Sequence, residues 1–167
     1  MTETDIVQQC QQGDIAAFAA LYDVYHQPML RVARDILHNK QDAEDAVHIT
    51  FVKLFHSIRH FRFQSKFKCY LFRILSRACY DILKKTKKQR TENIDHISQH
   101  IEQHTDLKIQ LEEAIKNLPE RMRLCFVLFA VEDFKLTEIA EITEMTLGGV
   151  KSTLYQARVR LRHYMEI

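Results

Sequence analysis

The 167-residue chain has only three glycines and two prolines. Turn-rich all-β folds and disordered chains use these residues heavily, so their scarcity argues against both classes. No apolar run approaches the roughly 18–20 residues that a membrane-spanning helix needs. The N-terminal segment MTETDIVQQC also lacks the apolar stretch of a secretory signal. We therefore expect a soluble, cytoplasmic protein without membrane insertion.

Disulfide, zinc-finger and catalytic signatures are missing as well. The four cysteines, Cys10, Cys69, Cys79 and Cys125, are scattered and form no CxxC pair. We interpret each as a small buried apolar residue in a reducing compartment. The sequence contains no glycine-rich phosphate loop, no nucleophile elbow and no HExxH motif. We therefore expect no enzymatic activity and no cofactor.

Charge is unevenly distributed, although the net charge is only +2. Residues 1–52 carry three basic and eight acidic residues, whereas residues 53–90 carry twelve basic residues and one acidic residue. Residues 91–145 carry five basic and twelve acidic residues, and residues 146–167 carry four and one. A solvated helix face explains many charge runs, but alternating blocks of this size indicate more than one kind of partner. We expect the basic blocks to bind nucleic acid and the acidic blocks to bind protein.

Apolar side chains recur at three- and four-residue spacing along most of the chain, and this periodicity predicts an all-α fold. We expect a short first helix that starts at Thr2 or Thr4 and ends near Gly13. Asp14 is expected to cap a second helix, because its side chain can accept a hydrogen bond from a free backbone N–H of the first turn. Pro28 lies inside that helix and is expected to kink or split it.

Two more helices are expected before residue 88. The third should begin around Asp42, which would place Asp42, Glu44 and Asp45 in its first turn, where acidic side chains favour the helix dipole. The fourth should be capped by Ser65. Later in the chain, Pro119 is expected at the first position of a helix, where the N–H that proline lacks has no partner.

The segment from residue 89 to about residue 106 is polar and poor in large apolar residues. We interpret residues 89–106 as a linker between two small helical domains, residues 1–88 and residues 107–167. Three histidines recur in it every four residues, so that a helix would place them on one face, where they could share a metal ion: His96, His100 and His104. Chance in a solvated segment explains this pattern better, so we expect no metal site.

The C-terminal segment has the pattern of a helix-turn-helix. A short helix over residues 136–142 and a four-residue turn precede Thr146, which is placed to cap a second helix. That helix would bury Val150, Leu154, Ala157 and Leu161. In this architecture the second helix enters the major groove of DNA, although a helical hairpin packed within its own domain gives the same pattern. The residues expected to face DNA are Gly149, Lys151, Ser152, Thr153, Gln156, Arg158, Arg160 and Arg162.

Between residues 59 and 77, aromatic and basic residues are interleaved across a loop and the start of a helix. This pattern is typical of single-stranded nucleic-acid sites, because bases stack on the rings while Lys and Arg contact the backbone. Leu71 and Phe72 are expected in the core, and a core role is the alternative for the other rings. We expect at least one of Phe61, Phe63 and Phe67 to be exposed. The candidates for contact with unpaired DNA are Phe61, Arg62, Phe63, Lys66, Phe67, Lys68, Tyr70, Arg73 and Arg77.

Together these segments resemble the extracytoplasmic-function (ECF) group of the sigma-70 family, the two-domain initiation subunits of bacterial RNA polymerase. DAEDAVHITFVKLF is similar to that family's region 2 signature. FKCYLFRILSRACYDILKK is similar to its promoter-melting segment, with Tyr70 where the family commonly has Trp. LPERMRLCFVLFAVEDFKLTEIAEIT, followed by GGVKSTLYQARVRLR, resembles region 4 with its helix-turn-helix. The resemblance extends from about Asp5 to Arg162.

The resemblance implies a factor that directs core RNA polymerase to promoter DNA and assists promoter melting, without catalytic activity of its own. The implied polymerase-binding residues are Asp42, Glu44, Asp45, His48 and Phe51. The helix dipole alone also explains the acidic residues. The chain departs from the family at His48, where Gln is usual, and at Gly149 and Thr153, where Thr and Arg are typical. An anti-sigma factor is a further candidate partner, and we expect a monomer when the chain is free or held by a partner.

Two other classes fit parts of the sequence. A stand-alone helix-turn-helix regulator would bind duplex DNA without core polymerase. A metal-dependent phosphodiester hydrolase would hold its metal ion with Asp42, Glu44 and Asp45, but no second acidic set has a compatible spacing. The aromatic rings distinguish the promoter-melting factor from the stand-alone regulator, because a regulator that binds only duplex DNA has no use for such rings outside its core.

Overall fold

The computed structural model describes the backbone of residues 1–92 and 106–165, and the side chains of residues 1–89 and 106–165. These residues form α-helices and one short 3-10 helix, with no β-strand among them. The predicted all-α class is therefore confirmed. Within the same ranges, no helix is both long enough and apolar enough to cross a membrane. The chain divides into two compact units, Met1–Cys79 and Tyr80–Ile167.

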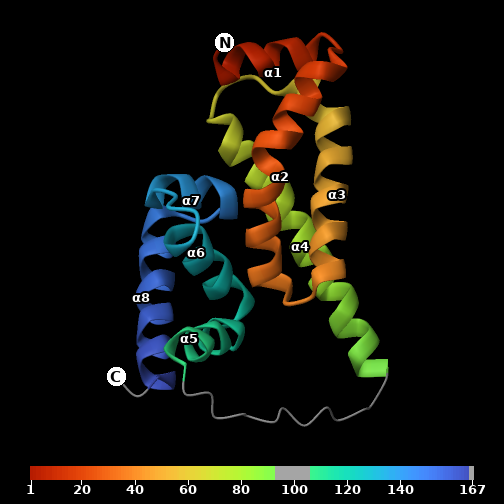
Figure 1. The fold of residues 1–167 in the computed structure, drawn as a ribbon. Coiled ribbons are helices and arrows are strands. Elements are labelled where there is room, and N and C mark those ends of the chain that lie inside the picture. The colour runs from red at the N-terminus through yellow and green to blue at the C-terminus, as the bar shows by residue number, and fades with distance from the viewer. Residues whose placement is uncertain (93–105, 166–167) are drawn as a thin grey trace. The chain divides into compact units, whose positions relative to one another are not determined.

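The first unit is a helical bundle around one apolar core (Figure 1). It contains α1 (Glu3–Gln11), α2 (Ile15–Leu37), α3 (Lys40–Ser57), the 3-10 helix η1 (Ile58–His60) and the first part of α4 (Phe67–Glu92). Helices α2 and α3 pack along each other, while α1 contacts both α2 and η1. The largest fully buried side chains here include Leu21, Met29, Ile36, Leu54, Leu71, Phe72 and Leu75. The core placement expected for Leu71 and Phe72 is thus confirmed.

The start of α2 agrees with the sequence, whereas its interior does not. The Asp14 carboxylate accepts a hydrogen bond from the Ala17 N–H at 3.2 Å, which confirms the expected cap. The expected split at Pro28 is wrong, because α2 runs unbroken for 23 residues. Proline removes one backbone hydrogen bond. Tyr25 and Met29 are buried on either side of it, and this packing holds the two halves of α2 in one helix.

Helix α3 begins two residues before the expected position. The Asn39 side chain accepts a hydrogen bond from the Asp42 N–H at 2.9 Å, so the helix starts at Lys40. Asp42 alone of the three acidic residues lies in the first turn, and Glu44 and Asp45 fall beyond it. The helix-dipole explanation therefore covers one carboxylate and not the other two.

Two other helix starts differ by one or two residues. Ser65 does not cap α4, because the first helical hydrogen bond runs from the Tyr70 N–H to the Lys66 carbonyl at 3.2 Å and α4 starts at Phe67. Pro119 stands just before α6 rather than at its first position, with an extended backbone (φ −52°, ψ 147°). Its carbonyl accepts the hydrogen bond from the Arg123 N–H at 2.9 Å.

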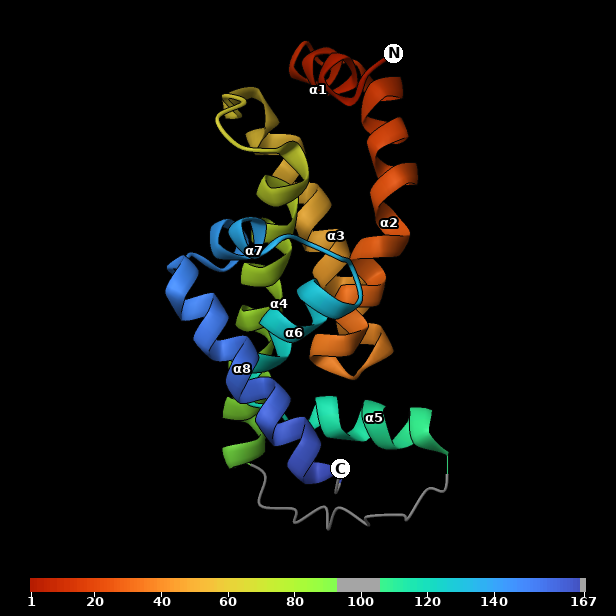
Figure 2. The same cartoon turned by 90° about the vertical axis from the view of Figure 1, so that its left-hand side faces the viewer.

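The second unit holds four helices beyond α4: α5 (Leu107–Lys116), α6 (Glu120–Ala130), α7 (Leu136–Thr143) and α8 (Leu147–Tyr164). Helix α8 contacts all of the other three, with α7 near its start and α5 near its end (Figure 2). The core between them includes Leu124, Leu128, Ile139, Ile142, Val150 and Leu154. Helix α8 is therefore held along its length by one buried stripe.

All four cysteines are buried and none forms a disulfide, which confirms the placement expected from their spacing. Burial raises the pKa of Cys79 to about 12 and that of Cys125 to about 11. These thiols stay protonated near neutral pH, and the thiolate is the reactive form. The cysteines therefore serve as packing residues.

Candidate nucleic-acid interface

The loop that joins η1 to α4, residues 61–66, contains two phenylalanines and is followed by a third at the start of α4, and one of these three rings is exposed. Phe63 is 40% exposed, whereas Phe61 and the adjoining Phe67 are 7% and 5% exposed. Phe63 has a φ of 59°. This left-handed backbone costs a bulky residue about 1–3 kcal/mol and persists only where the surroundings impose it. The expectation that at least one of these rings is exposed is confirmed, and the exposed ring is that of Phe63.

The rings below the loop form a buried cluster that supports it. The Phe61 ring lies 4.8 Å from the Tyr70 ring and 4.8 Å from the Phe63 ring, measured between centroids. Phe67 packs against Tyr25 of α2 at 5.8 Å. The Tyr70 hydroxyl donates a hydrogen bond to the Ser57 hydroxyl at 2.7 Å.

This packing corrects part of the expected single-strand site. Phe61 and Phe67 present almost no ring surface to solvent, because the rest of the aromatic cluster covers them. Tyr70 is half-buried in the same cluster. The stacking surface that the loop offers is therefore the ring of Phe63, with the other rings beneath it.

Basic side chains flank this loop. Tyr70, Arg73 and Arg77 are three and four residues apart, which places them on one face of α4, and the exposed Lys66 directly precedes that helix. Arg62, next to Phe63, is exposed. Lys68 turns toward the protein, with its ammonium nitrogen 5.9 Å from the centroid of the Phe72 ring. A cationic helix face beside one exposed ring is suited to a nucleic-acid strand with an unstacked base.

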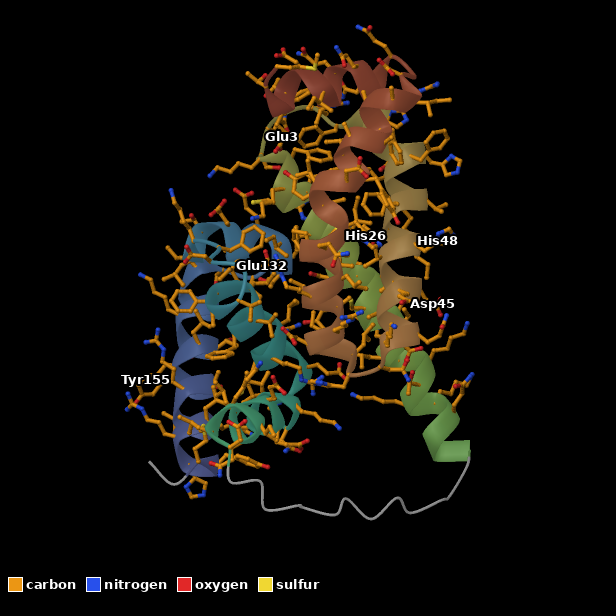
Figure 3. All side chains as sticks on the ribbon, viewed as in Figure 1. Glu3, His26, Asp45, His48, Glu132 and Tyr155 are labelled. Carbon is orange, nitrogen blue, oxygen red and sulfur yellow. The ribbon has the colours of Figure 1, made fainter. Side chains whose placement is uncertain are left out.

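A second surface lies on α3. Asp45, His48, Val52 and Phe55 are exposed and recur at three- and four-residue spacing, so they share one face of the helix. Figure 3 shows Asp45 and His48 projecting from α3. Phe55 is 56% exposed and Val52 is 45% exposed, which is unusual for large apolar side chains on one helix face. Exposed apolar surface of this kind is typical of a protein-binding site.

Phe51 does not belong to that exposed face. It is only 6% exposed, and its ring lies 4.7 Å from Tyr22 and 6.3 Å from Phe18 of α2. These rings cover Phe51 in this structure, and its expected contact with polymerase stays a prediction. Glu44 is exposed, whereas Asp42 is partly buried at the start of the helix.

Five residues on or next to this face had no predicted role: Val52 and Phe55 of α3, and Phe18, Tyr22 and His26 of α2. Phe55 stacks edge-on against Phe18 at 5.4 Å, and Tyr22 is 42% exposed beside His26, whose ring lies 4.8 Å away. Helical spacing in the sequence could have identified Val52 and Phe55, since they follow Asp45 by seven and ten residues and so lie on the same helix face. The residues of α2 could not be found this way, because they join the face only through helix packing.

The second unit contains the predicted helix-turn-helix. Helix α7 ends at Thr143, and the next residue, Glu144, reverses the chain with a φ of 59°. The Thr146 hydroxyl accepts a hydrogen bond from the Gly149 N–H at 3.0 Å. The predicted cap is therefore confirmed. The four residues of the predicted buried stripe, Val150, Leu154, Ala157 and Leu161, are all buried.

Gly149 has a local structural reason to lack a side chain. A Cβ atom there would lie 3.0 Å from the capping oxygen of Thr146, closer than almost all real contacts of this kind, whereas a Cβ on Gly148 would meet nothing. A side chain at Gly149 would therefore require the Thr146 side chain to shift by a few tenths of an ångström, whereas one at Gly148 would not.

The surface of α8 carries the predicted polar and basic residues. Lys151, Ser152, Gln156, Arg158, Arg160 and Arg162 are exposed, and Gly149 and Thr153 are partly exposed. The Arg158 guanidinium also lies 5.6 Å from the centroid of the Phe129 ring, which restricts its position. Tyr155 was not predicted as a contact residue, yet it is 70% exposed and projects from α8 (Figure 3). It follows Lys151 and Ser152 by four and three residues, so the helical spacing could have identified it.

Neither unit shows a metal centre in the part of the chain that the structure describes, where no three His, Cys, Asp or Glu side chains gather. His96, His100 and His104 lie outside the described residues.

A helix-turn-helix with a cationic recognition helix, joined to a unit with an exposed ring beside basic residues, defines a DNA-binding protein of transcription. Residues 21–89 match the family described as Sigma-70 region 2, and residues 108–161 match Sigma-70, region 4. The chain belongs to the extracytoplasmic-function group of the sigma-70 family. It is thus a sigma factor, a non-enzymatic initiation factor that directs RNA polymerase to promoters, and the stand-alone regulator is not favoured.

Individual relatives support this assignment. The chain is 35% identical over 141 residues to RNA polymerase sigma factor SigV of Bacillus subtilis (strain 168), covering 83% of this chain and 84% of that protein. It is 27% identical over 173 residues to ECF RNA polymerase sigma factor SigW of the same organism, covering 93% and 92%. CnrH, solved in complex with the cytosolic domain of CnrY, shares the fold with a TM-score of 0.77 at 21% identity, over 96% of this chain and 95% of that one. RpoE of Bartonella quintana, solved with the anti-sigma factor NepR, has a TM-score of 0.74 at 22% identity, over 90% and 97%.

The difference in ring exposure generates a stability prediction. Phe67→Ala should lower the free energy of unfolding by about 3–5 kcal/mol, because it removes a buried ring from the aromatic cluster. Phe63→Ala should lower it by much less, about 1 kcal/mol, because 40% of that side chain is already exposed. Urea unfolding followed by circular dichroism measures both values. Equal losses in the two variants would show that the Phe63 ring is also a core side chain.

Proposed function

We propose that this sigma factor acts through three surfaces: the α3 face binds core polymerase, the Phe63 loop holds a melted promoter base, and α8 reads duplex DNA. In this proposal, residues 1–88 form the polymerase-binding and melting domain, residues 107–167 form the duplex-binding domain, and residues 89–106 join them. The factor works in the cytoplasm, where the polymerase is. It has no catalytic activity of its own. It acts by binding one DNA sequence and the melted DNA conformation more tightly than the alternatives.

The observation that carries the melting role is the exposed Phe63 ring between basic side chains. Taking a base out of a duplex costs a few kcal/mol. Stacking on an aromatic ring returns about 1–3 kcal/mol per base, and contacts from Arg62, Lys66 and Arg73 to phosphates add a salt-dependent contribution. An initiation factor that melts DNA needs such a ring outside the core.

Phe63→Ala is expected to reduce open-complex formation with core polymerase about tenfold, within the 1–3 kcal/mol of one lost stacking contact. Permanganate footprinting of the melted segment measures this. Binding to closed duplex should be unchanged, and a template mismatched over the melted segment should restore opening, because it supplies the unstacking. Phe63→Tyr is the matched control, since it keeps a stacking ring. Normal melting by Phe63→Ala would exclude the loop as the melting element.

The α3 face is the proposed contact with core polymerase, because Asp45 and His48 lie beside the exposed apolar side chains of Val52 and Phe55. Asp45→Lys should weaken binding to core polymerase at least about tenfold, as reversal of a charge at an interface costs more than its removal. Asp81→Lys makes the same charge change at an exposed site of α4 and should leave the affinity unchanged. Fluorescence titration of labelled factor with core polymerase distinguishes them. Equal affinities for the two variants would place the polymerase contact elsewhere.

The recognition helix should divide its contacts between phosphates and bases. Lys151→Ala should weaken binding to all upstream sequences and reduce the slope of log affinity against log salt by about 0.9, the contribution of one phosphate contact. Gln156→Ala should instead change which bases are preferred, by about 1–3 kcal/mol at one position. Binding to a library of upstream elements at several salt concentrations separates the two effects. An unaltered base preference in Gln156→Ala would contradict its proposed reading role.

We further propose an anti-sigma factor as a partner that competes with core polymerase. Two solved structures with this fold, CnrH with CnrY and RpoE with NepR, contain a bound partner, and the second partner is named as an anti-sigma factor. The exposed apolar side chains of α3 offer a surface that such a partner would cover.

A further inference from the structure

We propose that Gln11, at the end of α1, is a positioning residue for promoter opening, which acts by fixing the backbone that presents Phe63. This inference rests on the proposed role of the Phe63 loop. It concerns a residue that touches neither DNA nor polymerase in that proposal.

The Gln11 side chain binds the loop at its base. Its amide nitrogen donates hydrogen bonds to the Ile58 carbonyl at 3.0 Å and to the Phe61 carbonyl at 2.8 Å. These carbonyls belong to the first residue of η1 and to the residue that follows η1. The amide therefore ties together the two ends of the turn from which the loop departs, across 47 and 50 residues of sequence.

The turn depends on this outside donor because it has few bonds of its own. Helix η1 has only three residues and no side-chain cap, and the Phe61 N–H donates to the Ile58 carbonyl at 3.2 Å. Carbonyls at the end of a helix need partners from elsewhere. Gln11 supplies that partner to the Phe61 carbonyl and gives the Ile58 carbonyl a second donor besides the Phe61 N–H, so that Phe61 is fixed in its backbone as well as in its buried ring.

Phe63 lies two residues beyond the Phe61 carbonyl and has the left-handed φ of 59°. A bulky residue keeps that conformation only when its surroundings impose it. The loop is constrained on one side by the Gln11 tether and on the other by Phe67, whose ring is buried at the start of α4. Without the tether, the turn can relax and the Phe63 ring loses its fixed exposed position.

Helix α1 is itself firmly attached and can serve as a support. Val7 and Cys10 are buried against the bundle. The Tyr25 hydroxyl of α2 donates a hydrogen bond to the Glu3 carboxylate at 2.7 Å. Burial and this bond raise the pKa of Tyr25, which keeps the hydroxyl protonated as the donor. Figure 1 shows α1 beside the N-terminal end of α2, and α1 also contacts η1.

The test replaces the amide without changing the length of the side chain. Gln11→Met removes both donors, and Gln11→Glu keeps the shape while offering acceptors to two carbonyls. Gln12→Met is the matched control, because Gln12 is the exposed neighbour with the same side chain. Each factor is assayed as the full chain with core polymerase for opening of duplex promoter and of a premelted template, and for affinity for core.

Both Gln11 variants should reduce opening of duplex promoter up to about tenfold, the scale of one stacking contact, while Gln12→Met behaves as the unaltered protein. Affinity for core polymerase should not change, and the premelted template should restore opening. In the Phe63→Ala background, Gln11→Met should have no further effect, since the two residues act through the same ring. If Gln11 only stabilised the domain, the reductions in promoter opening caused by Gln11→Met and Phe63→Ala would multiply in the double variant.

The outcomes separate this inference from the proposal on which it rests. Normal opening by Phe63→Ala would overturn the proposed melting loop and this inference with it. A defect in Phe63→Ala with normal opening by both Gln11 variants would overturn this inference alone. So would multiplying losses in the double variant, or loss of folding in both Gln11 variants, because the amide would then hold the domain together rather than position the loop.

Discussion

The burial of Phe61 and Phe67 is the constraint on which the first unit's DNA surface depends. Two rings packed against Tyr25 and Tyr70 pin both ends of a loop that has no regular structure. Burying a ring of this size contributes about 1.5–3 kcal/mol, so the two rings together exceed the cost of about 1–3 kcal/mol for one left-handed residue between them. The same packing that stabilises the bundle therefore keeps Phe63 out of it, and stability and DNA binding share one cluster.

On the α3 face, too, apolar side chains remain exposed next to the buried core. Phe51 is inside and Phe55, four residues later, is largely outside, although both contact Phe18. The inner face of α3 is apolar and buried, as in an ordinary amphipathic helix, but its outer face is not uniformly polar. Its outer side mixes charge with exposed apolar groups, so that a partner gains hydrophobic contact as well as electrostatic complementarity.

Much of this could be predicted from the sequence, because helical periodicity and capping are local properties. The buried stripe of α8 and the caps at Asp14 and Thr146 follow from residues within a few positions of one another. The sequence predictions failed where contacts between residues far apart in the sequence determine the structure. Pro28 did not split α2, since packing on both sides of it outweighs one lost hydrogen bond. Which of the three phenylalanines is exposed depends on long-range packing and on the bonds from Gln11, about 50 residues away, which no local pattern reveals.

The left-handed backbone at Phe63 has a consequence for how binding energy is used. A flexible loop would lose conformational entropy when it captured a base, and part of the stacking energy would be consumed in ordering the protein. Here the loop is ordered when the domain folds, and the strain of the left-handed residue lowers the free energy of unfolding of the domain. Capture of a base then requires the DNA alone to rearrange. If the loop holds a melted base as proposed, the factor is preorganised toward the melted strand, and the shape of six loop residues supports its discrimination between open and closed DNA.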